Sequence, residues 1–266
     1  MNSHLRVTLV QPEIAWQEPA RNRRMLAGHF RGLFGHTDLI VLPEMFTTGF
    51  SMDAPALAEE MDGPTVGWLR EEAVSLACAI TGSLIVREDG RYYNRLVWAS
   101  PDGTILHYDK RHLFRMAAEH EHYSAGSRRL IVEYKGWRIC PLVCYDLRFP
   151  VWSRSRDDTD LLVYVANWPA PRRDAWRALL PARAIENLCY CVGVNRVGTD
   201  GREVAYAGDS VALDYLGQPL FVETDEPFVR TVALSRDALD RHRESFPAHM
   251  DADDFDIRFA RDPDER

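Results

Sequence analysis

The stretch Leu142-Val143-Cys144-Tyr145-Asp146-Leu147-Arg148-Phe149-Pro150 places a thiol directly after an apolar run. Residues 137–143 have the composition of a buried strand, and a turn follows them. In α/β proteins, ligands bind beyond the carboxyl ends of the strands. Cys144 therefore stands where an α/β enzyme would carry a nucleophile. The alternative is a buried structural thiol, which is the commoner fate of a cysteine in an apolar run.

Two other reactive side chains follow predicted strands. Glu44 comes after the apolar residues 39–42 and Pro43, and Lys110 comes after Tyr108-Asp109. A nucleophilic thiol needs a base and a group that stabilises the developing oxyanion. Glu44 is the candidate base. Lys110 and the backbone N–H of Tyr145 are the candidate oxyanion donors.

Strands and helices alternate over most of the chain, which predicts an α/β fold. We find no repeat and no linker, so we expect residues 1–266 to form a single domain, with an acidic tail over residues 247–266. That tail is either a frayed end or an arm that packs on a partner subunit. The pattern Asp38-Leu39-Ile40-Val41-Leu42 recurs as Asp160-Leu161-Leu162-Val163-Tyr164 and suggests that two similar β–α halves pack face to face.

Composition limits the partners of the chain. Its 266 residues include 32 Lys and Arg against 40 Asp and Glu, a net charge of −8, which argues against nucleic-acid binding. We expect no membrane span, because none of the apolar runs approaches the required length of about 20 residues. The sequence has five cysteines, an odd number, and no signal-peptide pattern at its N-terminus. These features predict reduced thiols and a cytoplasmic location.

Three segments resemble the signature segments of the nitrilase (carbon–nitrogen hydrolase) superfamily in sequence, order and spacing. They are Pro43-Glu44, Tyr108-Asp109-Lys110-Arg111-His112-Leu113-Phe114, and residues 144–150. Residues 166–169, 183–187 and 208–210 resemble further family segments. Among the branches, residues 42–50 and 110–114 look most like bacterial ω-amidases, which hydrolyse the terminal amide of 2-oxoglutaramate and related oxo-acid monoamides.

The resemblance implies a four-layer α-β-β-α sandwich and a catalytic triad of Glu44, Lys110 and Cys144. It also implies a second active-site glutamate seven residues before Gly126, which is Glu119. Glu121 lies two residues later and is the alternative. The family reaction needs no metal and no cofactor. Family members pair through helical faces, so the resemblance implies a homodimer, with residues 171–188 and the acidic tail as candidate contacts.

The substrate-binding residues are predicted from their positions after the motif strands. Arg148 is suited to bind the carboxylate of an oxo-acid monoamide, unless it pairs with Asp146 or Glu186 instead. Aromatic side chains that follow these strands are candidate walls of a small pocket, or alternatively core residues: Phe46, Phe114, Tyr145 and Trp168. His112 is a candidate for orienting the Lys110 loop, or a packed loop histidine.

The sequence leaves rival functions open. The predicted partner is a small-molecule amide, and the nearest rival is another carbon–nitrogen hydrolase, such as a nitrilase, a carbamoylase or another aliphatic amidase. A non-catalytic binding protein on the same fold is a second rival, although retention of all three triad residues argues against it. A metal-dependent hydrolase using His120 and His122 is a third, but their spacing lacks the pattern of a structural zinc site.

Overall fold

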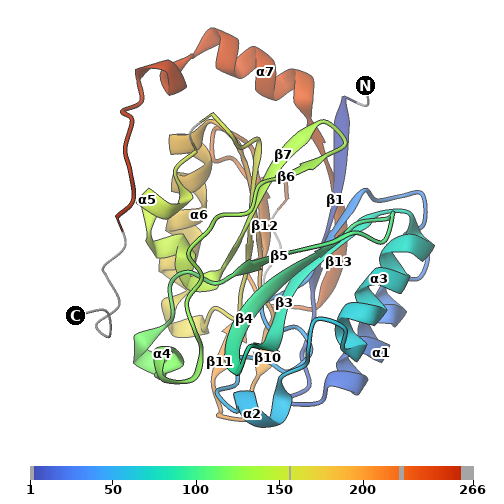
Figure 1. Ribbon diagram of the computed structural model, residues 1–266. Helices are drawn as coiled ribbons and strands as arrows, with labels where there is room; N and C mark the ends of the chain where they lie inside the picture. The colour runs from blue at the N-terminus through green and yellow to red at the C-terminus, as the bar shows by residue number, and fades with distance from the viewer. Residues whose placement is uncertain (1–2, 156, 222–224, 259–266) are drawn as a thin grey trace.

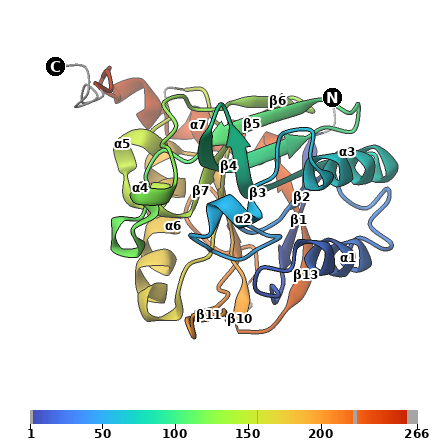
Figure 2. The ribbon, with the colours of Figure 1, turned by 60° about the horizontal axis from the view of Figure 1, so that its bottom comes forward.

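A computed structural model describes residues 3–155, 157–221 and 225–258. Within these residues, two β-sheets pack face to face, and helices cover their outer faces (Figures 1 and 2). The interior between the sheets is apolar and takes side chains from both, among them Leu5, Trp98, Leu142 and Val163. The predicted four-layer α-β-β-α sandwich is confirmed.

The first sheet has the strand order β13-β1-β2-β3-β4-β5. Its strands are β1 (His4–Gln11), β2 (Leu39–Val41), β3 (Ala79–Glu88), β4 (Arg91–Ala99), β5 (Ile105–Asp109) and β13 (Phe228–Ser235). The central strands β1, β2 and β3 are parallel, and the remaining pairs are antiparallel. The outer face of this sheet is covered by α1 (Pro19–His29) and α3 (Pro64–Leu76) (Figure 1).

The second sheet has the order β12-β9-β8-β7-β6. Its strands are β6 (Val132–Tyr134), β7 (Trp137–Val143), β8 (Leu161–Val165), β9 (Tyr190–Val194) and β12 (Val211–Leu213). Strands β7, β8 and β9 are parallel, as their counterparts are in the first sheet. The outer face carries α5 (Pro150–Ser153) and α6 (Arg173–Asn187). A separate hairpin joins β10 (Val197–Thr199) to β11 (Ala205–Ala207).

The connections contain short helices. They are α2 (Ala54–Leu57), η1 (Arg115–Ala117), α4 (Glu119–His122), η2 (Cys144–Arg148), η3 (Ala170–Arg172) and η4 (Ala248–Asp251). After β13 the chain enters α7 (Arg236–Ser245), which Ser235 caps by accepting a hydrogen bond from the backbone N–H of Ala238. Residues 252–258 of the predicted tail then run past α5 and α6 (Figure 1). Residues 259–266 of that tail lie outside the described residues.

Each sheet has the same arginine–aspartate contact at the amino ends of its parallel strands. Asp38 lies before β2 and accepts hydrogen bonds from both the backbone N–H and the guanidinium of Arg6. Asp160 lies before β8 and accepts the same set from Arg138. The registers correspond, because the residue after each arginine pairs with the residue after each aspartate. The prediction of two similar β–α halves is confirmed.

Among the helices of the described residues, none combines the length and the apolar character that crossing a membrane requires.

Candidate active site

The side chains of Glu44, Lys110 and Cys144 meet beyond the carboxyl ends of their strands. Glu44 follows β2, Lys110 directly follows β5, and Cys144 directly follows β7 as the first residue of η2. The Lys110 Nζ lies 2.8 Å from the Glu44 Oε1. Each side chain is at least nine-tenths buried. The arrangement therefore places a carboxylate, an ammonium and a thiol in one enclosed volume.

Three residues of the loops that carry these groups have left-handed backbone conformations. The φ angles are +42° at Met45, +45° at Cys144 and +57° at Ala118. Such conformations cost a non-glycine residue about 1–3 kcal/mol and persist only where the surrounding structure holds them. The Met45 N–H, for example, donates to the Ser83 Oγ at 2.9 Å. Left-handed residues thus occur at or beside each of the three positions that present Glu44, Cys144 and Glu119.

Lys110 binds two carboxylates at once. Its Nζ donates to Glu44 and to both oxygens of Glu119, at 3.0 and 2.9 Å. Burial by itself would lower the pKa of Lys110, but the Glu119 and Glu44 carboxylates outweigh burial and raise that pKa above its usual range. The two carboxylates therefore stabilise the charged form of Lys110.

Glu119, and not Glu121, joins this cluster. The Glu119 side chain is fully buried, and its Oε2 also accepts the Phe114 N–H at 2.6 Å. Burial raises the pKa of Glu119, Lys110 opposes this rise and the Glu44 charge adds to it. Glu121 lies at the surface of α4. The spacing from Gly126 thus indicated the glutamate that contacts Lys110.

Burial and the Glu44 charge favour the protonated form of the Cys144 thiol. Its pKa lies well above the ordinary value because of burial and, second, because of the neighbouring Glu44 carboxylate, and Lys110 offsets this only in part. The second oxygen of Glu44 accepts the backbone N–H of Asn167 at 2.8 Å, and the Cys144 Sγ lies 4.0 Å from the Asn167 carbonyl oxygen. Removal of the thiol proton would therefore need a base, and Glu44 is the adjacent carboxylate.

Asn94 is a residue of the site that the sequence analysis missed. It lies on β4, and its Nδ2 donates to Glu44 at 2.8 Å and to Glu119 at 3.1 Å. Its Oδ1 accepts the Ser83 hydroxyl at 2.8 Å. Asn94 therefore holds the two glutamates next to each other. The available signal was an amide within a predicted strand, since a buried amide needs partners.

Asp146 connects the Lys110 loop to the Cys144 turn and was also missed. Its Oδ1 accepts the backbone N–H of His112 at 3.0 Å and lies 2.8 Å from the His112 Nδ1. Its Oδ2 accepts the Tyr108 hydroxyl at 2.7 Å and the Val143 N–H at 3.1 Å. The His112 ring also stacks on Phe149 at 3.7 Å. His112 thus lies between the Lys110 loop and the Cys144 turn, which fits the hypothesis that it orients the Lys110 loop.

A cavity of about 180 Å³ opens above Cys144. Its lining includes four of the predicted substrate-binding residues, which are Phe114, Tyr145, Arg148 and Trp168. Phe50, whose ring centroid lies 5.2 Å from the Lys110 Nζ, and Tyr206 complete its aromatic walls. The volume is small against that of ordinary drug-sized pockets, which is about 300–1,000 Å³, so the cavity suits a small ligand.

Phe46 does not line this cavity, contrary to the prediction. Its side chain is fully buried in the core with Trp68, at a ring distance of 6.2 Å. A Cβ on Gly82 would lie only 2.8 Å from the Phe46 ring, so the glycine makes room for it. The left-handed turn at Met45 leaves Phe46 on the core side of the sheet. Phe50, four residues later, supplies the aromatic wall instead.

Arg148 is exposed, and its guanidinium lies over the Trp168 ring at 5.1 Å. The two carboxylates considered as structural partners are engaged elsewhere. Asp146 binds the groups described above, and Glu186 pairs with Arg183 at 3.0 Å. Among the described residues, no carboxylate forms an ion pair with Arg148.

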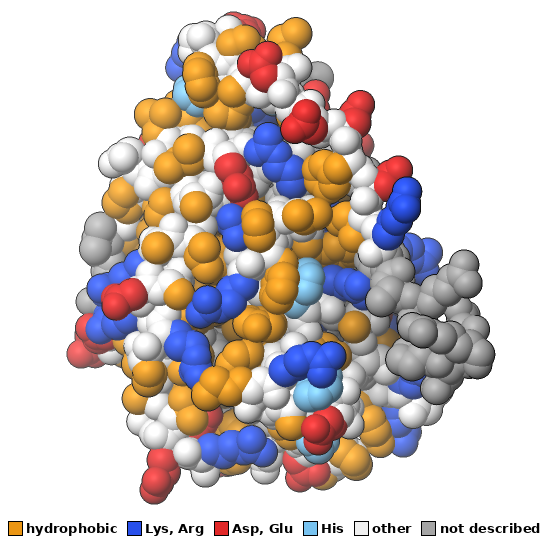
Figure 3. All heavy atoms as spheres, turned by 90° about the vertical axis from the view of Figure 1, so that its left-hand side faces the viewer, with side chains coloured by type: hydrophobic (Ala, Val, Ile, Leu, Met, Phe, Trp, Pro, Cys, Tyr) orange, Lys and Arg blue, Asp and Glu red, His pale blue; other side chains and the backbone are white. Residues whose placement is uncertain are grey.

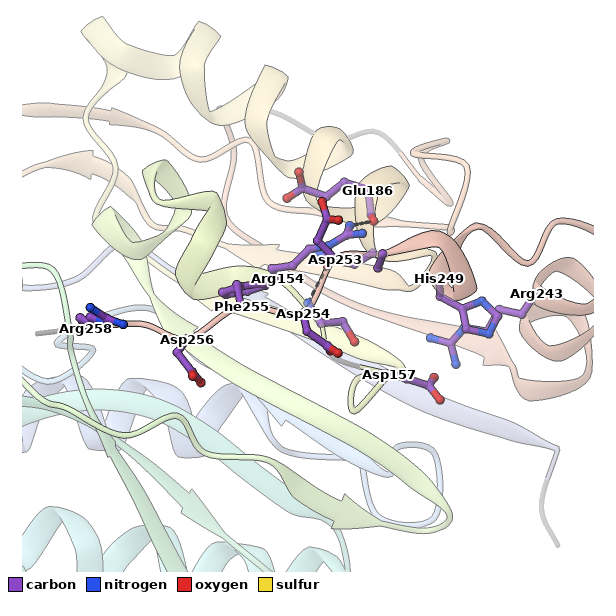
Figure 4. A pocket seen from close by; sticks show the side chains of 13 residues that line it. Arg154, Asp157, Glu186, Arg243, His249, Asp253, Asp254, Phe255, Asp256 and Arg258 are labelled. Carbon is purple, nitrogen blue, oxygen red and sulfur yellow. Dashed lines mark hydrogen bonds between the residues drawn. The ribbon is translucent and has the colours of Figure 1, made fainter.

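A larger hollow of about 670 Å³ lies between the tail and α6 (Figure 4). It is lined by charged side chains such as Arg154, Glu186 and Asp253, and it does not include Cys144.

The histidines of α4 form no metal site with other described residues. His120 and His122 are exposed on α4, and within the described ranges no three His, Cys, Asp or Glu side chains converge on a possible metal position. Of the two hollows, the one that contains Cys144 is therefore the candidate active site.

Known proteins resemble this chain in sequence and in fold. Residues 6–243 match the family described as carbon-nitrogen hydrolase. Omega-amidase YafV of Escherichia coli (strain K12) is 49% identical over 252 residues, which cover 94% of this chain and 98% of that protein. The 2-oxoglutaramate amidase of Bacillus subtilis (strain 168) is 33% identical over 250 residues, covering 92% and 96%.

A solved structure matches the fold closely. It is that of XC1258 from Xanthomonas campestris, a CN-hydrolase superfamily protein with an arsenic adduct in its active site, with a TM-score of 0.94, 52% identity and coverage of 96% of this chain and 99% of that one. The family match over most of the chain and relatives of this similarity show that the chain belongs to the carbon-nitrogen hydrolase family of amide-hydrolysing enzymes.

Proposed function

We propose that this enzyme hydrolyses the terminal amide of 2-oxoglutaramate, or of a related oxo-dicarboxylic acid monoamide, through a thioester on Cys144 with release of ammonia. The observation that carries the proposal is the buried cluster of Glu44, Lys110 and Glu119 beside a protonated thiol. The names of the two curated relatives support the choice of substrate.

The first half of the reaction forms the acyl-enzyme. Glu44 accepts the proton of the Cys144 thiol, and the sulfur attacks the amide carbon. The carbonyl oxygen becomes an oxyanion, which the Lys110 ammonium and the Tyr145 N–H stabilise. The C–N bond then breaks as the nitrogen takes the proton from Glu44, with Glu119 holding Lys110 in place. Ammonia leaves, and a thioester remains.

The second half releases the acid. A water molecule gives one proton to the Glu44 carboxylate and attacks the thioester carbon. The same oxyanion position is used again. The C–S bond breaks, the sulfur regains its proton from Glu44, and the carboxylic acid leaves. One amide and one water thus yield one acid and one ammonia, and the enzyme returns to its starting state.

The cavity supports a short substrate with an anionic end. Its volume of about 180 Å³ leaves little room for a long acyl group. Aromatic walls suit the carbon chain, and Arg148 at the lining offers a cation to a carboxylate. Neutral or bulky amides lack one or both of these matches.

Ammonia release tests the proposal. Wild type and Cys144→Ala are assayed with 2-oxoglutaramate, glutamine, asparagine and a simple nitrile. We expect release from the oxo-acid amide in the wild type and none in the variant, which keeps its fold by circular dichroism. Near-normal turnover of Cys144→Ala would remove Cys144 from the mechanism. Preference for the nitrile would place the enzyme with another branch of the family.

We also propose a homodimer that pairs through the face of α5 and α6. On this side of the molecule, apolar side chains lie among basic side chains (Figure 3), and Ile185 of α6 is 51% exposed. Light scattering is expected to give a dimer for the wild type and a monomer for Ile185→Arg. Val74→Arg on α3 is the matched control, because Val74 is equally exposed on the opposite side. A dimer that survives Ile185→Arg would exclude this face.

We place the enzyme in the cytoplasm. All five cysteines of the sequence lie in described residues, and each is buried and unpaired, which suits a reducing compartment. Fractionation of cells that produce the protein tests this location.

A further inference from the structure

The cavity above Cys144 carries more positive than negative charge at its outer part. Arg148, Arg172 and Arg202 lie on its lining together with one carboxylate, that of Asp200. The Asp200 carboxylate is already engaged, because it accepts the Arg202 and Val204 backbone N–H groups and the Tyr206 hydroxyl at 2.8–3.0 Å. The guanidinium groups are therefore left to attract an anionic ligand.

Arg172 is the most unusual of these arginines. It ends η3, and its guanidinium lies 5.4 Å from the centroid of the Phe114 ring, with Nη2 2.7 Å from the Met116 sulfur. A thioether is a weak acceptor. The neighbouring Arg173 and Arg177 both pair with Asp209, whereas Arg172 forms no ion pair with any carboxylate of the described residues. A half-buried cation is thus held by contacts that an anion would replace.

The position of Arg172 relates it to the nucleophile. Phe114, over which it lies, packs edge-on against Tyr145 at 5.0 Å, and Tyr145 follows Cys144 in the chain. The Trp168 indole N–H donates to the Arg172 carbonyl oxygen at 2.8 Å, and Arg148 lies over that same indole. Arg172 is less exposed than Arg148, so solvent and salt screen its charge less.

We propose that Arg172 binds the carboxylate of the substrate and thereby selects short dicarboxylic acid monoamides over neutral amides. The inference rests on the proposed amidase function of this cavity. It names the residue that binds the end of the substrate away from the reacting amide. A guanidinium can give two parallel hydrogen bonds to a carboxylate, and the carboxylate takes the place of the Met116 sulfur. Arg148 is the outer, more screened cation.

Two substrates that differ only at this end test the proposal. Glutaramate carries a carboxylate where glutaramide carries a second amide of similar size. We expect Arg172→Gln to lower kcat/KM for glutaramate by about 10- to 100-fold, mainly through KM, and for glutaramide by less than about threefold. Arg172→Lys is expected to lose less kcat/KM for glutaramate than Arg172→Gln, because lysine keeps the positive charge but not the two parallel N–H donors. Arg177→Gln, which loses the same charge outside the cavity, changes neither substrate.

A second variant keeps the arginine and changes its partner. Met116→Glu offers Arg172 an internal carboxylate, and we expect KM for glutaramate to rise while glutaramide is little affected. Equal losses on both substrates in Arg172→Gln would mean that Arg172 only shapes the cavity, and wild-type kcat/KM on both substrates would pass the role to Arg148. A wild type that hydrolyses both substrates equally overturns this inference alone. A wild type that releases ammonia from neither of them nor from 2-oxoglutaramate overturns the proposed function as well.

Discussion

The half built on β1 and β2 and the half built on β7 and β8 share one end and differ at the other. At the amino ends, Arg6 binds Asp38 and Arg138 binds Asp160 through the same atoms. At the carboxyl ends the residues differ. Gln11 and Glu44 lie there in the first half, and Cys144 and Asn167 lie there in the second.

The two ends have different roles. We expect the amino ends to contribute to stability and the carboxyl ends to carry the proposed chemistry. The shared arginine–aspartate pairs join the strands of each half, while the proposed base comes from one half and the proposed nucleophile from the other. Two further ion pairs join the halves at the shared end: Lys135, in the hairpin of the second sheet, binds Asp38, and Arg236, which follows β13 of the first sheet, binds Asp160. The site exists only where the two sheets are packed together.

The largest effect is expected at the ends that differ. Glu44→Gln removes the proposed base while keeping the side-chain shape, so we expect kcat to fall by about 10²- to 10⁴-fold with little change in Tm. Gln11→Ala is the counterpart: it leaves the buried Ser210 N–H unpaired and costs about 1–3 kcal/mol of stability without loss of chemistry. If Glu44→Gln kept more than a tenth of the wild-type rate, the base would lie elsewhere.

The shared ends set the next largest effect. Asp160→Asn leaves Arg138, Arg236 and Arg243 without their buried carboxylate, and we expect a loss of about 3–5 kcal/mol in the free energy of unfolding. Asp38→Asn is expected to cost less, because the Arg6 and Lys135 side chains are each 37% exposed, against 13% for Arg243. Denaturant titration measures both. A greater loss for Asp38→Asn would contradict this order.

The same aspartates make stability depend on pH. Burial would raise the pKa of each carboxyl, but the hydrogen bonds from Arg6 and Lys135 to Asp38, and from Arg138 and Arg243 to Asp160, outweigh burial and lower both to about 2. The folded pKa is below the unfolded value of about 3.9, so the contribution is complete above that value and is lost as the pH falls toward 2. We expect the double variant Asp38→Asn/Asp160→Asn to show a flatter decline in unfolding free energy between pH 5 and pH 2. An unchanged slope would show that other carboxylates dominate acid unfolding.

The smallest effect concerns two cysteines at equivalent places. Cys78 precedes β3 and Cys189 precedes β9, and each follows a left-handed residue that ends a helix, Ala77 after α3 and Leu188 after α6. Burial raises the pKa of both thiols to about 12, so neither is reactive. We expect Cys78→Ala and Cys189→Ala to cost about 1 kcal/mol each, with unchanged kcat. Loss of activity in either variant would mean that these thiols reach the site.

Much of the site followed from the order of residues along the chain. A strand that ends at Cys144, and others that precede Glu44 and Lys110, predict a common edge because parallel strands present their carboxyl ends together. The α/β class and the repeated pattern at Asp38 and Asp160 were also accessible, because these features are local or periodic. Glu119 was implied by the family resemblance, through its spacing from Gly126.

Tertiary structure decided the rest. The contact between Asn94 and Glu44 joins residues 50 positions apart, and no local pattern encodes such a pairing. A left-handed turn at Met45 decided that Phe50 rather than Phe46 reaches the cavity, because one residue of changed φ redirects everything after it. The unpaired state of Arg172 beside paired Arg173 and Arg177 likewise depends on where Asp209 lies in space. The sequence determined which chemical groups are available, and the packing of two sheets determined which of them meet.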